Sequence, residues 1–339
     1  MVEPLIRDLK GNDMKNGTHR LAAGLFAGLF LLMSNASGQT YPDKPIKLIV
    51  PYAPGGATDL VARAVGREMS RILGQPILVE NRPGNVGAVA ADFTAKSAPD
   101  GYTLCMCTDG PLSITPTLQP TAVTYRTARD FMPVSLVNLV ELGLFARAGL
   151  PASNLAEVVA AAKAAPGKLT YATASVPGPN FLAFEAFMQR AGVKMLNVPY
   201  KGDGPAIVAL AGGEVDLFVG GIQSALPMIQ AGRVKGIAMT GMARSKLAPN
   251  VATVNESGYL GFEHNAWAGV VVPAGTSPSI INQLRNAVFL AIKEPAVIKT
   301  FESNGLVGVG STPEEFRKVI EQDTVKFAEV IKRLNLKLD

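Results

Sequence analysis

The residues with the clearest chemical potential form a corner between an apolar run and an amphipathic segment, IVPYAPGGATDL (49–60). Its glycine pair, Gly55 and Gly56, can adopt backbone angles closed to other residues and leaves room for a ligand to approach the backbone. The start of the following helix would offer unpaired N–H groups and the positive end of a dipole. The sequence therefore predicts an anion site built from backbone donors. The alternative is a purely structural turn in which Thr58 or Asp59 caps the helix.

Similar corners follow four other expected strands and contain the same small residues. They read CTDGP, TASVPGPN, VPYKGDGPA and VGGIQSA, at 107–111, 173–180, 198–206 and 219–225. Ligands of open α/β sheets bind at the carboxyl ends of strands, so these corners could converge on one cleft lined by amides and small hydroxyls. Such a cleft could hold a carboxylate without a dedicated arginine. Lys201 and Arg63 are the nearby cations, and Arg63 lies about one turn into its helix, where exposure to solvent is expected.

Motifs for catalysis and metal binding are missing from the sequence. His264 is the sole histidine after the expected leader, and no serine stands in G-x-S-x-G, which argues against a hydrolase triad. The chain has no G-x-x-x-x-G-K-[ST], and neither GDGPAI nor GVGSTP fits the dinucleotide fingerprint. No H-E-x-x-H or Cys/His cluster offers a metal site. Four carboxylates could act as acids or bases, but caps, turns or surface positions explain them as easily: Asp59, Asp109, Asp203 and Asp216.

A binding protein is therefore favoured over an enzyme, with no catalytic residue, no cofactor and no metal. Lys201 could act as a nucleophile only in a desolvating pocket, which the sequence does not show. Trp267 could stack on a ligand, although packing near a junction between lobes is the preferred interpretation.

The two cysteines, Cys105 and Cys107, lie in the expected strand GYTLCMCTDG. Residues two apart in a strand point to the same face, and a disulfide between them would be strained in an extended strand. A metal pair would need further ligands. We therefore expect two buried small hydrophobic residues.

Expected strands and helices alternate along the chain. The strands are expected at 46–53, 76–82, 102–107, 168–173, 194–200, 215–221, 234–240 and 266–275. The helices are expected at 60–73, 88–98, from Asn154 onward, and at 180–191, 205–213, 224–232, 278–293, 295–303 and 313–334. Repeated βα units imply mostly parallel sheets covered by helices.

These units fall into two sets, which suggests two α/β lobes. The chain would cross over at VSLVNLVELGLF (134–145) and return near His264 to Trp267. The expected division is a signal peptide with an N-terminal extension at 1–38, lobe 1 at 39–141 and 264–339, and lobe 2 at 142–263.

The composition fits an exported globular protein. The 339 residues are 48% hydrophobic and 17% charged, enough for a large core and about two domains. The net charge of +5 is spread without basic runs or interleaved aromatics, so no nucleic-acid partner is expected. The apolar block 21–33 follows Lys15 and Arg20 and precedes small polar residues, a pattern typical of a secretory signal too short to span a bilayer. The mature chain should begin near Gln39 to Tyr41.

Several longer stretches carry a family resemblance. They are YPDKPIKLIVPYAPGGATDLVAR, GQPILVENRPGNVGAVAADFTAKSAPDGYTL, VPYKGDGPAIVALAGGEVDLF and ALPMIQAGRVKGIAMTG, and the likeness runs from about Tyr41 to the C-terminus through WAGVVVPAGTSPSIINQL and STPEEFRKVI. The combination of P-Y-x-P-G-G-x-x-D, E-N-R-x-G and P-Y-K-G at these separations resembles the Bug-type extracytoplasmic solute receptors. These receptors are the binding-protein components of tripartite tricarboxylate transporters.

The resemblance implies a two-lobed Venus-flytrap fold of the periplasmic-binding-protein type (type II-like), each lobe a mostly parallel sheet flanked by helices. It implies a periplasmic monomer that captures a small carboxylate, a di- or tricarboxylate or an aromatic acid, for a membrane permease. It assigns ligand contacts to the corners at 51–59, 108–110, 175–180 and 199–202. With the corner at 219–225, the candidate ligand-binding residues are Tyr52, Pro54, Gly55, Gly56, Ala57, Thr58, Asp59, Thr108, Asp109, Ser175, Val176, Gly178, Asn180, Tyr200, Lys201, Gly202, Gly221 and Gln223.

Two departures from the family pattern fall where the second lobe would touch the distal part of a ligand. VPGPNFLAFEAF replaces a Ser- or Gly-rich stretch before a helix with His-Leu, and VGGIQSA stands where an Asp or Asn is common. Pro177, Pro179 and Phe181 favour a stiffer, more apolar wall, and hence an aromatic or longer-chain acid. Two other roles stay open: a sensor that presents ligand to a membrane signalling protein, and an exported α/β enzyme dependent on His264 or Asp59.

Overall fold

The computed structural model describes residues 41–174 and 176–336. A compact unit begins at Lys44 and contains the helices and strands given below. The expected leader at 1–38 and the candidate cleft residue Ser175 lie outside the described residues. Across the described part of the chain, no helix has the length and hydrophobicity needed to span a membrane.

The first sheet has six strands in the order β11-β4-β10-β3-β1-β2. Strand β1 pairs in parallel with β2 and β3, whereas β10 is antiparallel to β3 and β4, and β11 is antiparallel to β4. The strands are β1 (Ile46–Val50), β2 (Ile77–Asn81), β3 (Thr103–Thr108), β4 (Phe131–Val140), β10 (Ala266–Pro273) and β11 (Leu306–Gly308).

The second sheet has five strands in the order β7-β6-β8-β5-β9. Strand β6 pairs in parallel with β7 and β8, and β5 is antiparallel to β8 and β9. The strands are β5 (Leu142–Arg147), β6 (Thr170–Thr173), β7 (Leu196–Pro199), β8 (Leu217–Gly221) and β9 (Val234–Met239).

The α/β class with two helix-flanked sheets is confirmed, and in each sheet four strands run in one direction: β1, β2, β3 and β4 in the first, and β6, β7, β8 and β9 in the second. The βα units do pair in parallel. Each sheet, however, also takes in a strand that arrives from the other sheet, β10 in the first and β5 in the second, and this strand runs against its neighbours. Hydrophobic periodicity carries no information on strand direction, so the sequence pattern could not reveal this.

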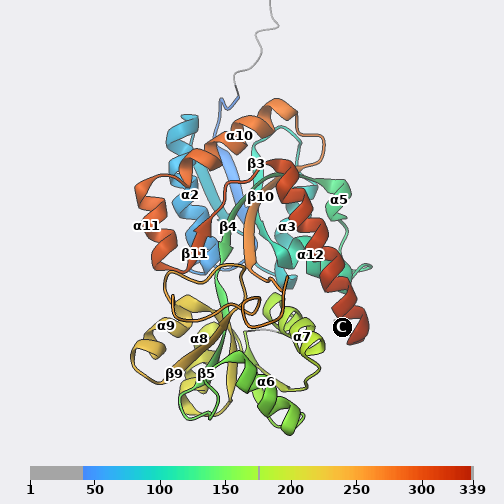
Figure 1. Cartoon of the computed structure of the whole chain (residues 1–339). Coiled ribbons are helices and arrows are strands. Elements are labelled where there is room, and N and C mark those ends of the chain that lie inside the picture. The colour runs from blue at the N-terminus through green and yellow to red at the C-terminus, as the bar shows by residue number, and fades with distance from the viewer. Residues whose placement is uncertain (1–40, 175, 337–339) are drawn as a thin grey trace, which may run out of the picture. The chain divides into compact units, whose positions relative to one another are not determined.

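Two connections join the sheets within the compact unit (Figure 1). A single residue, Glu141, separates β4 from β5, and the long segment 240–265 leads from β9 back to β10. We call the first sheet and its helices lobe 1 and the second sheet and its helices lobe 2. We propose boundaries at 141/142 and 263/264, since the chain leaves one sheet and enters the other at these points.

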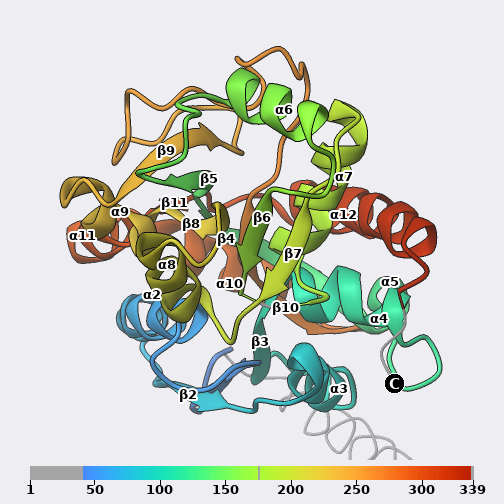
Figure 2. The same cartoon turned by 90° about the horizontal axis from the view of Figure 1, so that it is seen from below.

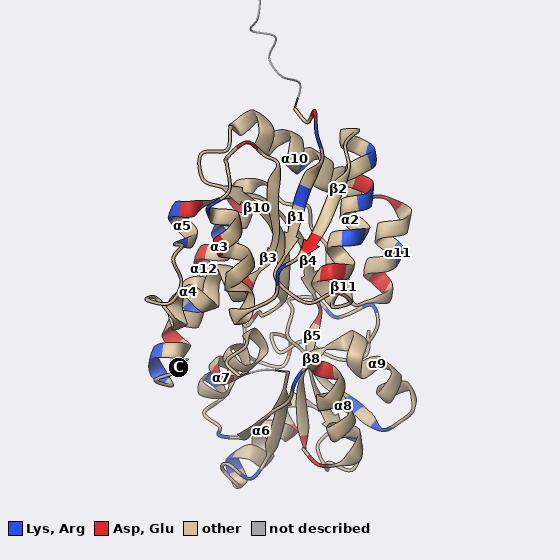
Figure 3. Ribbon diagram, turned by 180° about the vertical axis from the view of Figure 1, so that it is seen from behind, with Lys and Arg blue, Asp and Glu red and all other residues tan. Residues whose placement is uncertain are grey.

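Helices cover both faces of the first sheet. Helices α2, α10 and α11 pack together on one face, and α3 and α12 cover the other, where Phe316 and Ile320 of α12 meet Trp267 in the core. The bounds are α2 (Ala57–Leu73), α3 (Ala88–Ala95), α10 (Pro278–Ala291), α11 (Pro295–Ser303) and α12 (Pro313–Arg333). Short elements not expected from the sequence are η1 (Asn85–Gly87), η2 (Gly110–Ile114), α4 (Thr115–Leu118) and α5 (Thr127–Asp130). Charged residues occur along α2 (Figure 3); its arginines, Arg63, Arg67 and Arg71, are exposed, whereas Asp59 is buried.

The second sheet is covered in the same way (Figure 2). Alternate residues of β5 face opposite sides: Leu144 and Ala146 pack with α6 and α7, and Phe145 packs with α8 and α9. This is the period of two expected for a strand buried on both faces. The helices are α6 (Leu155–Ala164), α7 (Pro179–Ala191), α8 (Asp203–Gly212) and α9 (Ile222–Gln230).

Helix α12 joins the two lobes. It begins with a capping box, in which Thr312 accepts from the N–H of Glu315 and the Glu315 side chain accepts from the N–H of Thr312. Its last turns leave the first sheet, and Phe327, Val330 and Ile331 enter the main core of lobe 2.

The cysteines form a disulfide, which corrects the expectation of two free thiols. Cys105 and Cys107 are fully buried, as expected, but their sulfur atoms are bonded. Their Cα atoms are 5.2 Å apart, within the usual range for disulfides. An ideally extended strand would separate them by about 6.6 Å. The local contraction of β3, which the sequence did not reveal, brings the two sulfur atoms within bonding distance.

Candidate ligand-binding cleft

A cleft of about 740 Å³ lies between the two lobes at the ends of several strands. This volume is in the range of sites for small organic ligands. Ten candidate residues line it: Tyr52, Gly55, Gly56, Ala57, Thr58, Thr108, Asp109, Asn180, Gly202 and Gln223. The structure thus brings together all the glycine-bearing corners predicted from the sequence.

Four helices begin at the cleft, one from lobe 1 and three from lobe 2. The first residues of α2, α7, α8 and α9 are at or beside the lining. None of these four helices has a side-chain cap; away from the cleft, α6, α10 and α12 are capped by Asn154, Ser277 and Thr312, while α3 and α11 are also uncapped. Uncapped helix starts present N–H donors and the positive ends of dipoles, so the cleft is suited to an anion.

The corner after β1 is held in shape by Asp59, which lies behind the cleft lining. One carboxylate oxygen of Asp59 accepts from the N–H of Gly55 at 2.9 Å and from Nε of Arg63 at 2.9 Å. The other accepts from Nδ2 of Asn81 at 2.9 Å. The hydrogen bond from Arg63 is the main reason why the pKa of Asp59 is lowered to about 2, with the Gly55 and Asn81 bonds adding to it. Asp59 therefore shapes the corner while Gly56, Ala57 and Thr58 face the cleft.

Gly55 shows why this corner needs glycine. Its φ of +87° lies in the left-handed region, which other residues rarely adopt. Gly56 has an ordinary φ of −78°, and a Cβ added to it would have Ala53 O, at 3.8 Å, as its nearest neighbour. A side chain at Gly56 is therefore compatible with the backbone.

The segment after β3 places two polar side chains in lobe 1. The hydroxyl of Tyr52 lies 2.9 Å from Oγ1 of Thr108, and a Cβ at Gly110 would come within 2.9 Å of that hydroxyl. Asp109 is 3% exposed, and its Oδ1 accepts from the N–H of Gly110 at 2.8 Å. Its Oδ2 is buried and has no hydrogen-bond partner among the described residues. Burial, and then the negative charge of Asp323, raise the pKa of Asp109 to about 8.

Lobe 2 contributes a second carboxyl group of this kind. Asp203, the first residue of α8, accepts from the N–H of Gly221 through Oδ2 at 3.1 Å. Its Oδ1 is buried and also has no partner within the described residues, and burial raises the pKa of Asp203. The Oε1 of Gln223 is also buried and has no hydrogen-bond partner among the described residues.

Seven candidate residues are not part of the lining, and Ser175 is not described. The seven are Pro54, Asp59, Val176, Gly178, Tyr200, Lys201 and Gly221. Asp59 and Gly221 instead contact lining residues, through the hydrogen bonds of Asp59 with Gly55 and of Gly221 with Asp203. Gly178 is the N-cap residue of α7. Lys201 is exposed. Of the expected apolar wall, Pro179 lines the cleft, Phe181 is buried in the core of lobe 2, and Pro177 is not in the lining.

The lining also includes residues outside the set of candidate ligand-binding residues, among them Pro179, Asp203 and Trp267, for which the sequence allowed the roles of a wall residue, an acid or base, and a stacking residue, respectively. The additional lining residues are Val61, Asn138, Val140, Leu142, Ala174, Pro179, Asp203, Gly204, Ser224, Ala266, Trp267, Ala268 and Leu306. Asn138 could have been noticed as a polar residue within the apolar crossover VSLVNLVELGLF. Several others come from β10, β11 and the β4–β5 connection, which pass between the lobes. Among the described residues of this lining, Lys and Arg are absent, and the charged residues are Asp109 and Asp203.

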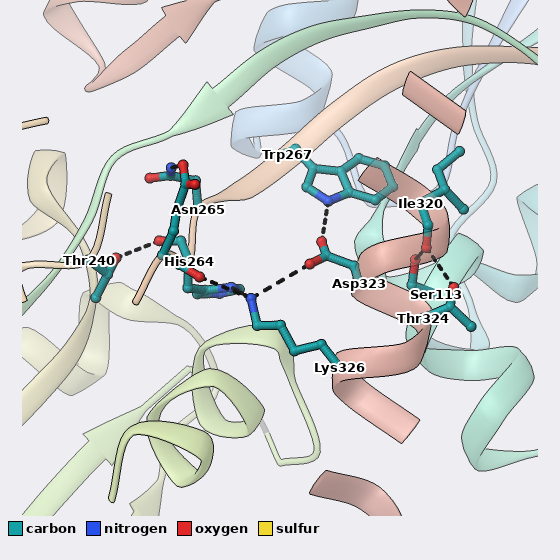
Figure 4. A network of polar contacts seen from close by, with 10 residues as sticks. Ser113, Thr240, His264, Asn265, Trp267, Ile320, Asp323, Thr324 and Lys326 are labelled. Carbon is teal, nitrogen blue, oxygen red and sulfur yellow. Dashed lines mark hydrogen bonds and ion pairs between the residues drawn. The ribbon is translucent and has the colours of Figure 1, made fainter. Parts of the chain in front are cut away.

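His264 and Trp267 belong to a polar network beside the hinge (Figure 4). Trp267 is 2% exposed, donates from Nε1 to Oδ2 of Asp323 at 2.6 Å and packs edge-on against Phe316. His264 is 2% exposed, and its Nδ1 lies 3.4 Å from Nζ of Lys326. Burial, and secondarily the charge of Lys326, lower the pKa of His264 well below its usual value. Both residues thus have packing roles at the junction, and Trp267 also reaches the cleft lining.

A second cavity of about 540 Å³ lies within lobe 1. Its lining is mainly apolar, from α4, α5 and α12, and contains none of the candidate residues. The cleft between the lobes is therefore the candidate site.

A family model matches most of the chain. It describes the receptors of the tripartite tricarboxylate transporter family and aligns with residues 61–336. Among characterised sequences, Protein BugT of Bordetella pertussis is 36% identical over 325 residues, which cover 95% of this chain and 99% of BugT.

Two solved structures show the same fold with ligands. MatC of Rhodopseudomonas palustris with bound malate is 31% identical, with a TM-score of 0.71, over 86% of this chain and 100% of MatC. A second R. palustris protein, solved with adipate, is 29% identical, with a TM-score of 0.73, over 86% of this chain and 97% of that protein.

Proposed function

The chain belongs to the tripartite tricarboxylate transporter receptor family, and we propose that it is a periplasmic receptor that captures a small carboxylate for a membrane permease. The family is one of solute-binding receptors, and binding without catalysis is part of the proposal. The periplasmic location, the carboxylate and the permease partner are parts of the proposal. Two structurally similar proteins contain malate and adipate, both dicarboxylates, which supports this ligand class.

The observation that carries the proposal is the convergence of four uncapped helix starts on one cleft. A carboxylate would receive hydrogen bonds from backbone N–H groups and would lie at the positive ends of four dipoles. Each end contributes a fraction of a charge, so several together can replace a lysine or arginine. Val61, Val140 and Leu142 give the same cleft an apolar side suited to a hydrocarbon chain.

The division of the lining between two lobes suggests how a loaded receptor would differ in shape from an empty one. A ligand that contacts α2 in lobe 1 and α7 to α9 in lobe 2 binds better when the lobes are closer together. It therefore shifts the population toward a closed form by its difference in affinity for the two forms. We propose that the permease recognises this closed form.

The test is a thermal-shift screen of mono-, di- and tricarboxylates, aromatic acids, neutral sugars and amines, followed by calorimetry on the compounds that raise the melting temperature. The proposal expects carboxylates to give the shifts. A screen in which neutral sugars or amines stabilise the protein and carboxylates do not would exclude the ligand class.

A variant of the α2 corner tests the site itself. Gly56→Val should weaken carboxylate binding by at least about tenfold, equivalent to about 1.4 kcal/mol, because the side chain blocks approach to the helix start. The φ of −78° and the free space at Gly56 let the variant fold. Gly212→Val is the matched control, since Gly212 is an exposed residue at the end of α8, away from the cleft lining. Equal affinity of the two variants would show that the corner does not bind the ligand.

A further inference from the structure

Two carboxyl groups in the cleft share an unusual arrangement, one in each lobe. Asp109 uses Oδ1 to accept from the N–H of Gly110, and Asp203 uses Oδ2 to accept from the N–H of Gly221. In each case the other oxygen, Oδ2 of Asp109 and Oδ1 of Asp203, is buried without a partner among the described residues. Both residues line the cleft. A buried polar atom of this kind is costly unless a ligand satisfies it.

The surroundings give these carboxyl groups little cationic compensation. No Lys or Arg belongs to the described cleft lining. The ionisable groups that act on Asp109 are Tyr52 from the corner after β1 and Asp323 and Lys326 from α12. Burial raises the pKa of Asp203, and the N–H of Gly221 and the side chain of Ser224 partly lower it again. No charged group among the described residues is a main cause of this shift.

A carboxylate ligand would therefore meet two negative charges if both groups were ionised. Removing this repulsion requires a proton on each carboxyl group. The proton turns the buried oxygen that has no partner into a hydrogen-bond donor. Burial favours this neutral form in both cases, and the pKa of Asp109 is raised to about 8.

We propose that Asp109 and Asp203 are protonated in the ligand-bound cleft and donate hydrogen bonds from Oδ2 and Oδ1, respectively, to oxygen atoms of the bound carboxylate. This inference rests on the proposed function and adds a specificity rule to it. The ligand must present acceptor oxygens to both lobes, and an ammonium group at either position would require ionised partners instead. Ligand and protons are then bound together.

The proposal predicts a falling affinity at alkaline pH. Above the pKa of a donor carboxyl group, each pH unit should weaken binding about tenfold per proton required. The organic acid itself stays ionised from about pH 6.5 to 9.5, so its own titration does not contribute. His264 stays neutral over this range because burial lowers its pKa, and burial raises the pKa of Tyr52 beyond its ordinary value.

Replacement of each aspartate by asparagine tests whether the carboxyl group is a protonated hydrogen-bond donor or an ionised carboxylate. In Asp109→Asn, Oδ1 can still accept from Gly110 while Nδ2 replaces the protonated Oδ2 as a donor. The same exchange applies in Asp203→Asn, with Gly221 as the retained partner. Asp100→Asn is the control, because it removes one charge from an exposed surface side chain.

The experiment uses the full mature protein and the carboxylate that gives the largest thermal shift in the screen above. Its affinity is measured by calorimetry at several pH values from about 6.5 to 9.5, in two buffers with different ionisation enthalpies. The buffer dependence gives the number of protons taken up or released on binding.

Three results are expected. The wild-type protein and Asp100→Asn lose affinity as pH rises past about 8, near the pKa of Asp109, and take up protons on binding in that range. Asp109→Asn loses most of this pH dependence and takes up fewer protons, so that it binds at least about tenfold more tightly than the wild type at pH 9.5. Asp203→Asn also takes up fewer protons on binding than the wild type.

Other results overturn the inference. A wild-type affinity that is constant over the whole range would show that binding is not coupled to proton uptake, and proton release on binding would show that the carboxyl groups are ionised in the complex; either result overturns the coupled binding of ligand and protons. Tighter binding by Asp109→Asn already at pH 6.5, by the same factor as at pH 9.5, would show that Asp109 repels the ligand throughout. If no carboxylate binds at pH 6.5, the proposed function itself fails, and this inference fails with it.

Discussion

At the scale of single residues, the acidic side chains near the cleft have opposite roles. Asp59 is ionised and holds the α2 corner through Gly55, Arg63 and Asn81. Asp109 is buried beside another acid, and its pKa is raised instead of lowered. The same residue type thus holds the backbone in one place and lines the cleft in another, and its neighbours decide which.

The role of Asp59 predicts a pH-dependent loss of stability on substitution. Its pKa is lowered from 3.8 to about 2, so its contribution to folding is present above about pH 4 and is lost as the pH falls toward 2. Asp59→Asn should lower the free energy of unfolding by about 1 to 2 kcal/mol at pH 7, since half-exposed Arg63 is partly screened by solvent. Urea unfolding at pH 7, 5, 4 and 3 checks this.

The difference between the two proteins should begin to shrink between pH 4 and pH 3, because Asp59 takes up a proton in the unfolded wild-type chain, where its pKa is 3.8, while it stays mostly ionised in the folded protein. Asp100→Asn, which changes an exposed carboxylate, serves as the control. A difference that is as large at pH 3 as at pH 7 would mean that Asp59 acts through something other than its charge.

Many residues of the candidate site could be predicted because the turns between strands and helices depend on residues that are neighbours in the sequence. Glycine pairs, strand ends and helix starts identified Gly55, Gly56, Asn180 and Gly202. Trp267 and Leu306 were not among the candidate residues because they reach the cleft from strands that pair far along the chain. Lys201 was placed in the site by its motif, but the chain turns its side chain to solvent.

At the scale of elements, the helices and strands expected from periodicity are present within a few residues of their expected ends. Gly74 follows the last residue of α2 and Gly192 that of α7, and both adopt the left-handed conformation typical of helix ends. The mixed pairing of the sheets and the Cys105–Cys107 disulfide were not predicted. Both depend on the direction or local contraction of strands, which are set by partners distant in the sequence.

Helix α12 should stabilise both lobes, because its two halves belong to different cores. Phe327 is fully buried in the main core of lobe 2, whereas Phe316 packs in lobe 1. Phe327→Ala should lower the free energy of unfolding by about 3 to 5 kcal/mol, the usual cost of emptying a buried aromatic site. Val325→Ala, on the same helix and 61% exposed, should change it by less than about 0.5 kcal/mol.

Urea denaturation of both variants gives the comparison. Similar stabilities for Phe327→Ala and Val325→Ala would show that the second half of α12 adds little to the core of lobe 2.

At the scale of the compact unit, the proposed binding cleft and the connections between the lobes lie close together. The cleft lies close to the points where the chain passes between the lobes, because Val140 and Leu142 on either side of Glu141 line it, as does Ala266 at the end of the connection 240–265. Helix α12 crosses the same junction, and Arg333 near its end donates to the backbone oxygen of Glu185 in α7. A ligand held by both lobes therefore acts on the elements that connect them.

Ligand binding should consequently bring the lobes closer together. Small-angle X-ray scattering of the mature protein, with and without a saturating amount of the best carboxylate from the screen, is expected to show a smaller radius of gyration in the loaded sample. Gly212→Val should contract like the wild type, because its substitution is remote from the cleft lining. At a ligand concentration only a few times the wild-type Kd, Gly56→Val should contract less than the wild type, because its weaker binding leaves more of the protein unloaded. If binding is tight by calorimetry but the radius does not change, the two lobes are already in their final arrangement without ligand, and a permease would have to distinguish the loaded receptor by the ligand itself rather than by closure.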